Sequence, residues 1–254
     1  MSVGESVPKL LEDEVVNFPE QPLNINFMFS RHKQASDIPT EFQELTHSSD
    51  LIIIEGVAQQ PEMLALLQRL SDGDEAALAE HSTKLTLGPE ASFVRKRARL
   101  IFGSGAQIHN PEPPIDHPAA SRYMDVVLRE QAIVKELKKE GPVEAKKVGK
   151  LTLSVLNDLA RAAAERDKYI ISHLFPTDLR QSHGVLNVLM LYGAMHKHIA
   201  DVVAKEANRQ QRTDINVNRN ITSAGDLGRF YDTYLAGGNL TLQDAILNYG
   251  IPVE

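Results

Sequence analysis

Four polar residues have side chains suited to a reactive site: His32, Glu55 and His196 can bind a divalent cation or activate water, and Arg166 can bind an anion. A neutral imidazole ligates metals, and a carboxylate beside it can complete the metal site or accept a proton from a bound water. A guanidinium can bind a carboxylate or stabilise negative charge that develops during a reaction. We therefore expect these four residues to form one polar site.

Three of these residues follow segments that are typical of strands. The apolar runs 23–30, 51–54 and 184–192 lead into Arg31 and His32, into Glu55, and into Gly193 and His196. Ligands of open parallel sheets bind outside the carboxyl ends of the strands, so these positions are candidates for a site. Gly193 lies where the backbone must leave its strand, and a glycine there permits a tight turn or close approach of a ligand.

Strand and helix patterns alternate along the chain. Apolar runs predict strands at 23–30, 51–56 and 184–192, and an alternating pattern predicts another at 213–220. Residues 106–110 have the composition of a short strand. Helical patterns cover 36–50 with Thr40 as N-cap, 61–73 with Pro61 at its start, 74–85, 91–102, 196–210, 225–238 and 241–250. Two long helices, separated at Gly141-Pro142, are expected between about 119 and 175.

This order favours an α/β fold with a central, mostly parallel sheet flanked by helices and a long-helix insertion in the middle. We expect residues 1–22 to form an N-terminal arm and residues 23–254 to form a single domain. The region 119–175 is expected to be a helical subdomain or cap. A chain of 254 residues with 42% apolar and 24% charged residues fits such a globular domain.

The formal net charge of −7 argues against a nucleic-acid partner or an anionic membrane surface. Because the chain has no cysteine, any metal must be held by His, Asp, Glu or backbone oxygen. The same absence fits a reducing compartment. The N-terminus lacks a signal-peptide pattern, and no apolar run approaches the roughly 20 residues of a membrane helix. We expect a soluble, cytoplasmic protein that binds a small molecule or a peptide.

The order of these motifs resembles the TraB/PrgY and TIKI proteins, part of a wider group with erythromycin esterase-like and ChaN-like proteins. Members carry a Gly-x-x-His after the first strand, a Glu after the second, a Glu-Arg-Asp helix and a second Gly-x-x-His. The matching residues here are Glu55, Glu165-Arg166-Asp167 and Gly193-Ala194-Met195-His196. The segment 115–118 is similar to an Asp-containing segment of some members, which adds Asp116. The resemblance runs from about residue 23 to residue 210 and depends on the order and spacing of short motifs.

The first motif departs from the family pattern. It reads Phe29-Ser30-Arg31-His32, so phenylalanine stands where the family has glycine. A bulky side chain there would crowd a ligand, and the charge of Arg31 disfavours a cation at His32. An anionic group in place of a metal is therefore one alternative for this site.

TIKI members are metal-dependent proteases, so the resemblance implies a metal-assisted hydrolase that acts on a peptide or an ester. It implies His32, His196 and Glu55 as ligands of Mn, Co or Zn, with Glu55 as ligand or general base. Arg166 would clamp a carboxylate or stabilise negative charge, and Asp167 would orient Arg166 or a histidine. The residues expected to contact substrate are Arg31, Gly193 and Asp116.

Two other functions remain open on the same scaffold. The departure at Phe29 favours a non-catalytic binding or regulatory protein. The third hypothesis is a metal-free hydrolase of the erythromycin esterase kind, in which a histidine acts as the base. Plainer roles exist for single residues as well: His196 and His198 as surface histidines, and the triplet 165–167 as a salt-bridged helix face.

Overall fold

The computed structural model describes residues 8–30, 41–56, 61–84, 91–139, 145–180, 184–221, 229–241 and 243–244. The chain divides into two compact units. Residues 15–112 and 170–225 form one, which we call the sheet unit. Residues 1–14, 113–169 and 226–254 form the other, the helical unit. The predicted division into an arm and a single domain stays a prediction.

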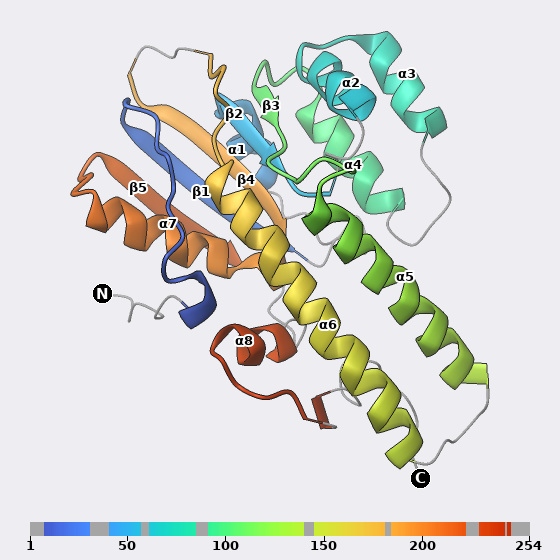
Figure 1. Ribbon diagram of the computed structural model, residues 1–254. Helices are drawn as coiled ribbons and strands as arrows, with labels where there is room; N and C mark the ends of the chain where they lie inside the picture. The colour runs from blue at the N-terminus through green and yellow to red at the C-terminus, as the bar shows by residue number, and fades with distance from the viewer. Residues whose placement is uncertain are drawn as a thin grey trace. The chain divides into compact units, whose positions relative to one another are not determined.

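The sheet unit contains five strands, and every neighbouring pair is parallel (Figure 1). The strands are β1 (Leu23–Ser30), β2 (Leu51–Ile54), β3 (Gln107–His109), β4 (Leu186–Gly193) and β5 (Ile215–Ile221). Their order in the sheet is β3-β2-β4-β1-β5. The predicted α/β fold with a mostly parallel central sheet is therefore confirmed. Since β4 lies between β1 and β2, the carboxyl ends of these three strands adjoin one another.

Helices cover both faces of this sheet. They are α1 (Glu41–His47), α2 (Pro61–Ser71), α3 (Glu75–Lys84), α4 (Ala91–Ile101) and α7 (His198–Arg209). Figure 1 shows α7 on one face, beside β5, with α1 on the opposite face. Apolar residues of the strands, among them Ile52 and Leu189, form one buried cluster with Phe42 of α1, Leu67 of α2 and Ile101 of α4. Burial of these side chains is the main force that holds the layers together.

The helix boundaries follow from local chemistry. Pro61 begins α2, where its missing N–H is not needed. Gly73 follows the end of that helix with φ of +85°, and its N–H donates to the carbonyl of Leu70 at 3.0 Å. Asp74 then caps α3, because its carboxylate accepts the N–H groups of Ala76 and Ala77.

The helical unit contains α5 (Pro118–Lys139), most of α6 (Ala145–Ser172), α8 (Arg229–Leu235) and a 3-10 turn, η1 (Lys9–Leu11). The long helices α5 and α6 are the predicted pair, and the break expected at 141–142 lies outside the described residues. The turn η1 was not expected from the sequence, because one turn is too short to show helical periodicity. The role of this region as a cap stays a prediction.

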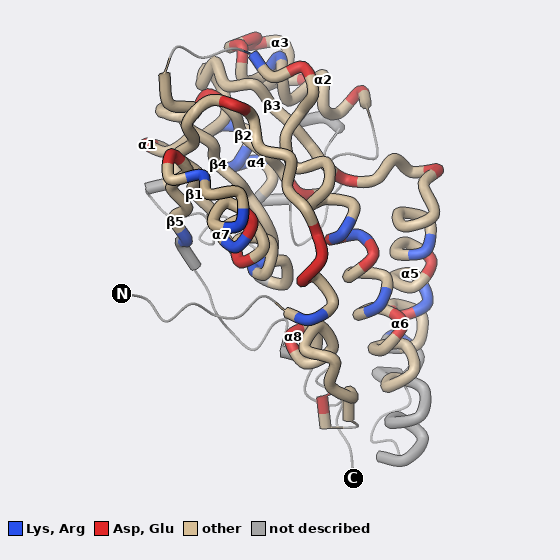
Figure 2. The backbone as a smooth tube through the Cα atoms, turned by 60° about the vertical axis from the view of Figure 1, so that its left-hand side comes forward, with Lys and Arg blue, Asp and Glu red and all other residues tan. Residues whose placement is uncertain are grey.

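Charged residues of both signs recur along α5, α6 and α7, as Figure 2 shows. Among the described residues, none of the helices combines the length and the hydropathy of a membrane-spanning segment.

Candidate functional site

Glu55, Gly193 and His196 meet at the carboxyl ends of β2 and β4. The backbone N–H of Glu55 donates to the carbonyl of Leu191 at 3.0 Å, so the β2–β4 ladder continues one residue beyond β2. The Gly193 N–H donates to Oε2 of Glu55. The other carboxylate oxygen, Oε1, lies 3.0 Å from Nε2 of His196. Both oxygens of Glu55 are thus held by residues that follow or end the neighbouring strand.

A second acid, Glu112, holds the turn that follows Glu55. Gly56 has φ of +82°, a conformation that glycine adopts readily, and its N–H donates to Oε1 of Glu112 at 3.2 Å. Glu112 is buried, and its own N–H donates to Oδ1 of Asn110 at 3.0 Å. Sequence reasoning missed Glu112. The available signal was its place two residues after Asn110, in the loop that directly follows β3.

Position 193 requires glycine because a side chain there would crowd Glu55, not because of its backbone conformation. Its φ of −62° and ψ of 148° are open to any residue. A Cβ built there would lie 3.1 Å from Oε2 of Glu55, closer than ordinary van der Waals contact. The glycine therefore lets the carboxylate approach the backbone closely enough to accept its N–H.

We expect Gly193→Ala to displace the Glu55 carboxylate, because the added Cβ would lie 3.1 Å from Oε2. If Glu55 binds a cation or accepts a proton, that displacement should lower affinity or rate about tenfold, because small misplacements of a reacting group reduce rates strongly. The melting temperature should fall modestly, since the backbone conformation at Gly193 accepts alanine but the Gly193 N–H loses its bond to the carboxylate. Isothermal titration and thermal unfolding measure the two effects. An unchanged affinity and rate, with the protein folded, would show that Glu55 need not lie against this backbone.

His196 lies in the 3-10 turn η3 (Ala194–His196), directly after β4. Its side chain is 1% exposed, whereas that of Glu55 is 13% exposed. The ring of Tyr192 lies edge-on to it, with centroids 6.2 Å apart. His196 is thus not a surface histidine, and the carboxylate is the member of the pair that is more open to water.

A buried acid, Asp201, ties the start of α7 to β5. Asp201 forms an ion pair with Arg219 of β5, and its Oδ2 lies 3.4 Å from Nδ1 of His198. His198 and Asp201 are both buried. The interpretation of His198 as a plain surface residue is therefore wrong.

At the end of β3, His109 has a structural role. Its Nε2 lies 3.0 Å from the carbonyl oxygen of His173, and a carbonyl only accepts, so Nε2 must carry the proton. Burial lowers the pKa of His109 below its ordinary value, which favours the neutral ring. His109 therefore acts as a fixed hydrogen-bond donor within the fold.

The first family motif is only partly visible. Arg31 and His32 lie outside the described residues. Phe29 is fully buried, and its ring stacks on Phe27 with centroids 5.6 Å apart and an interplanar angle of 12°. The bulk of Phe29 is thus taken up within the core of the sheet unit.

Arg166 and Asp167 lie on the part of α6 that belongs to the helical unit. The guanidinium of Arg166 lies over the ring of Tyr123, 4.9 Å from its centroid. Asp167 is fully buried and accepts a hydrogen bond of 2.6 Å from the hydroxyl of Tyr231 on α8. Sequence reasoning missed Tyr231, which bore no motif. Both residues have partners within their own unit, and their roles at the Glu55 pair stay predictions.

Glu165 and Asp116 are the other two residues of the helical unit that the family motifs select. The first pairs with an opposite charge, and the second faces water. Glu165 forms an ion pair with Arg122 of α5, so the interpretation of this helix face as salt-bridged is confirmed for Glu165. Asp116 is exposed in the turn before α5. Its assignment as a substrate contact stays a prediction.

The donor types at the Glu55 pair fit a divalent cation. A carboxylate oxygen and an imidazole nitrogen both ligate Mn, Co or Zn. Their separation of 3.0 Å is close to the roughly 3.3 Å between two ligands of a tetrahedral zinc ion. No group of three or more His, Asp or Glu side chains able to hold a metal occurs among the described residues. The described residues thus supply two donors, and His32 is the third donor that the sequence predicts.

No family model, curated protein or solved structure matches this chain. The likeness to the TraB/PrgY and TIKI proteins therefore stays a prediction, and a function has to be argued from the geometry of the site.

Proposed function

We propose that the chain is a metal-assisted hydrolase that cleaves a peptide or an ester bond. The observation that carries the proposal is the Glu55 carboxylate, held by the Gly193 N–H and paired with His196 at the carboxyl ends of two adjacent parallel strands. This edge of a parallel sheet is where ligands of such folds bind.

Glu55 and His196 would hold the cation, with His32 as the third ligand that the sequence predicts. When bound, a divalent cation supplies an acidified water and a Lewis acid for the carbonyl of the substrate. Three protein ligands would leave a coordination position open, as in catalytic rather than structural sites.

The chain's own residues divide the remaining work. The Gly193 N–H holds Oε2 of Glu55, which leaves Oε1 as the oxygen that faces His196. If the histidines hold the cation without Glu55, this carboxylate is the group placed to accept a proton from water, because it is the more exposed member of the pair. His196 is buried, which fixes its ring and directs Nε2 toward the carboxylate.

Metal content tests this proposal. The purified protein is incubated with Mn, Co or Zn, dialysed and analysed for bound metal, beside His196→Ala and His32→Ala. We expect near-stoichiometric metal in the unsubstituted protein and at least a tenfold loss of affinity in both variants. The control is His47→Ala, which removes an exposed histidine at the end of α1 and should change nothing. A protein that binds none of the three ions contradicts the metal-assisted mechanism.

The direct contact between Glu55 and His196 also favours a second candidate, a metal-free hydrolase. A carboxylate and an imidazole 3.0 Å apart already form a complete hydrogen-bonded pair. In that mechanism a histidine acts as the base, and the Glu55 carboxylate orients the ring of His196 through Nε2. Turnover of ester or peptide substrates that persists in a strong chelator identifies this candidate. Absence of turnover with and without metal would instead identify the non-catalytic binding protein.

A further inference from the structure

The two edges of the parallel sheet differ in how their backbone is covered. At one edge, β3 has only three residues, and a side chain of α2 caps its outward backbone groups. The N–H of Ile108 donates to Oε1 of Gln68 at 2.8 Å, and Nε2 of Gln68 donates to the carbonyl of Ala106 at 3.1 Å. Because short or covered edge strands resist pairing with another chain, the edge at β3 is closed.

At the other edge, β5 is longer, with seven residues, and lies at the end of the sheet (Figure 1). The N–H of Leu23 donates to the carbonyl of Asp214 at 3.0 Å, so the carbonyl of Asp214 faces β1. Backbone groups alternate between the two sides of a strand, so Ile215, Val217 and Arg219 direct theirs outward. The outward N–H and C=O groups of Val217 and Arg219 make no hydrogen bond within the described ranges, and this edge is open.

The open strand also lacks the free charges that commonly keep a sheet edge apart from other chains. Residues 215–218 carry no charge, and the guanidinium of Arg219 is held by Asp201 of α7. On the same face as Arg219, the apolar side chains of Ile215 and Val217 are only half-buried. Burial of these two side chains by another strand would be favourable.

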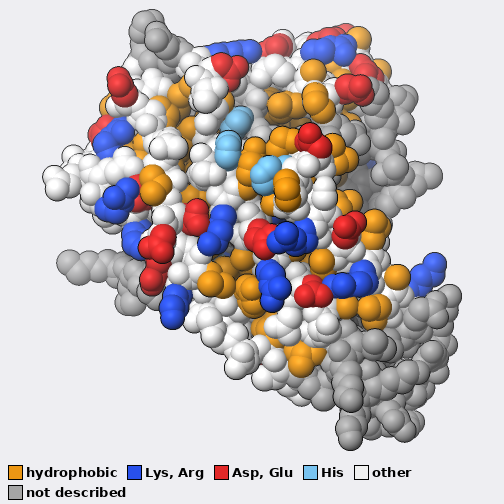
Figure 3. Space-filling view, in the orientation of Figure 1, with side chains coloured by type: hydrophobic (Ala, Val, Ile, Leu, Met, Phe, Trp, Pro, Cys, Tyr) orange, Lys and Arg blue, Asp and Glu red, His pale blue; other side chains and the backbone are white. Residues whose placement is uncertain are grey.

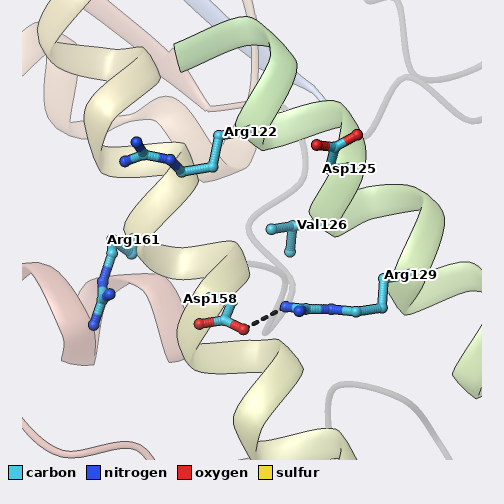
Figure 4. A pocket seen from close by; sticks show the side chains of 6 residues that line it. All are labelled: Arg122, Asp125, Val126, Arg129, Asp158 and Arg161. Atoms are coloured by element: carbon cyan, nitrogen blue, oxygen red, sulfur yellow. Dashed lines mark hydrogen bonds and ion pairs between the residues drawn. The ribbon is translucent and has the colours of Figure 1, made fainter. Parts of the chain in front are cut away.

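Two other surfaces carry exposed charges. On the face drawn in Figure 3, acidic and basic side chains lie interleaved. In the groove between α5 and α6, Arg129 pairs with Asp158, while the exposed side chains of Asp125 and Arg161 point away from each other (Figure 4). Copies of a chain with net charge −7 repel one another, so a strand edge without free charge favours their close approach.

A row of asparagine side chains crosses the sheet and ends at β5. Nδ2 of Asn24 donates to Oδ1 of Asn187 on β4 at 3.2 Å. Oδ1 of Asn24 accepts from Nδ2 of Asn216 and of Asn218, both at 3.2 Å, and Asn218 also donates to Oδ1 of Asn26 at 3.2 Å. Both asparagines of β5 thus donate inward. Their own Oδ1 atoms accept no hydrogen bond in the part of the chain that the structure describes, so the row ends with unused acceptors.

We propose that a second copy of this chain pairs with this edge, with the two β5 strands antiparallel about a two-fold axis at Val217. Val217 then exchanges two N–H···O=C bonds with Val217 of the second copy, as in a closely spaced pair of an antiparallel ladder. Ile215 pairs in the same way with Arg219 of the second copy. A register shifted by one residue would bring backbone groups that already face β1 to the new interface, and it could not form this ladder. Two-fold symmetric interfaces are the commonest among soluble oligomers.

The same register places Asn216 opposite Asn218 of the second copy. These are the positions of an antiparallel ladder where side chains come closest, with Cβ atoms about 4.5–5.5 Å apart. An asparagine amide carries two donor hydrogens and an acceptor oxygen. Asn216 uses one hydrogen for Asn24, so the other can donate to the unused Oδ1 of Asn218 across the axis. The row of asparagines then continues from one copy into the other.

Sedimentation equilibrium of the full chain at about 1–200 µM tests the pairing, because interfaces of this small size associate in the micromolar range. We expect a reversible equilibrium between monomer and dimer. The double variant Asn216→Asp/Asn218→Asp places like charges opposite each other and should weaken dimerisation by about tenfold or more. The double variant Asn216→Lys/Asn218→Asp places opposite charges there and should dimerise within about threefold of the unsubstituted protein. Both variants lose the same inward hydrogen bonds of Asn218, and thermal unfolding verifies that both fold.

The matched control is Gln131→Glu/Asn239→Asp, which adds the same two negative charges at exposed positions of the helical unit and should leave dimerisation unchanged. A monomer at every concentration overturns the proposal. A folded Asn216→Asp/Asn218→Asp variant that dimerises like the unsubstituted protein overturns it as well. If Asn216→Lys/Asn218→Asp stays monomeric while folded, residues 216 and 218 do not face each other, and the proposed pairing is wrong.

Amide hydrogen exchange gives an independent measurement at the edge itself. The N–H of Val217 should exchange more slowly as the protein concentration rises, because it becomes hydrogen-bonded in the dimer. The N–H of Asn216 faces β1 already, so its exchange should change less. Equal exchange rates of Val217 at low and high concentration, in a protein that dimerises, would show that the dimer uses another surface. Metal content at the Glu55 pair is measured separately, so this proposal and the proposed function fail independently.

Discussion

Replacement of Glu55 by glutamine is expected to lower hydrolytic turnover by about two to four orders of magnitude, the usual contribution of a general base. Glutamine keeps the length of the side chain and an oxygen that can accept the Gly193 N–H. It loses the negative charge that His196 faces at 3.0 Å, and it cannot accept a proton from water. The measurement is kcat/KM on a panel of esters and peptides, with and without added Mn, Co or Zn.

Glu112→Gln is the matched control for this substitution. Glu112 is a buried acid at the same edge of the sheet, but its carboxylate accepts the N–H of Gly56. Glutamine can still accept that bond, so turnover should stay within about threefold of the unsubstituted protein, a small change beside that of a lost base. If both variants lose activity equally, activity depends on the total negative charge at this edge of the sheet and not on Glu55 in particular. If Glu55→Gln stays active while folded, Glu55 is neither base nor essential ligand.

The α/β architecture could be predicted because the strands are short, apolar and buried. The run 51–54 is apolar at every position and is fully buried in β2. The order of the strands could not be predicted, because β4 lies between β1 and β2 although it comes more than 130 residues after either of them. Local patterns carry no information on such long-range pairing.

The sequence predicts those residues of the candidate site that lie at the ends of strands. Glu55 and Gly193 follow or end adjacent parallel strands, and this geometry alone brings them together. Glu112 and Tyr231 escaped prediction for a different reason. Glu112 lies in a loop and accepts a hydrogen bond from Gly56, 56 positions away. Tyr231 lies in a short helix and donates one to Asp167, 64 positions away. No periodicity or motif encodes a contact of that kind.

Above about pH 10, the free energy of unfolding is expected to fall more steeply for the unsubstituted protein than for Tyr231→Phe. Burial first, and the Asp167 charge second, raise the pKa of Tyr231 well above its ordinary value. In the unfolded chain this tyrosine titrates near 10, as exposed tyrosines do. Between these two pKa values the unfolded chain has lost a proton that the folded protein keeps, so a rise in pH favours unfolding.

The contribution of Tyr231 to stability is therefore complete below about pH 10 and is lost as the pH rises toward the folded pKa. One such group adds a slope of about −1.4 kcal/mol per pH unit to the free energy of unfolding. At pH 7, Tyr231→Phe should be less stable by about 1.5–3 kcal/mol, because Asp167 loses a hydrogen bond to a charged oxygen.

Urea unfolding between pH 7 and 11 measures the loss of stability at pH 7 and the slope with pH. Tyr234→Phe is the control for loss of a hydroxyl from α8. Because the unsubstituted protein loses the stabilising contribution of Tyr231 above about pH 10, its free energy of unfolding should approach that of Tyr231→Phe there. If the two plots of unfolding free energy against pH stay parallel, the pKa of Tyr231 is not raised in the folded protein, and the prediction is wrong.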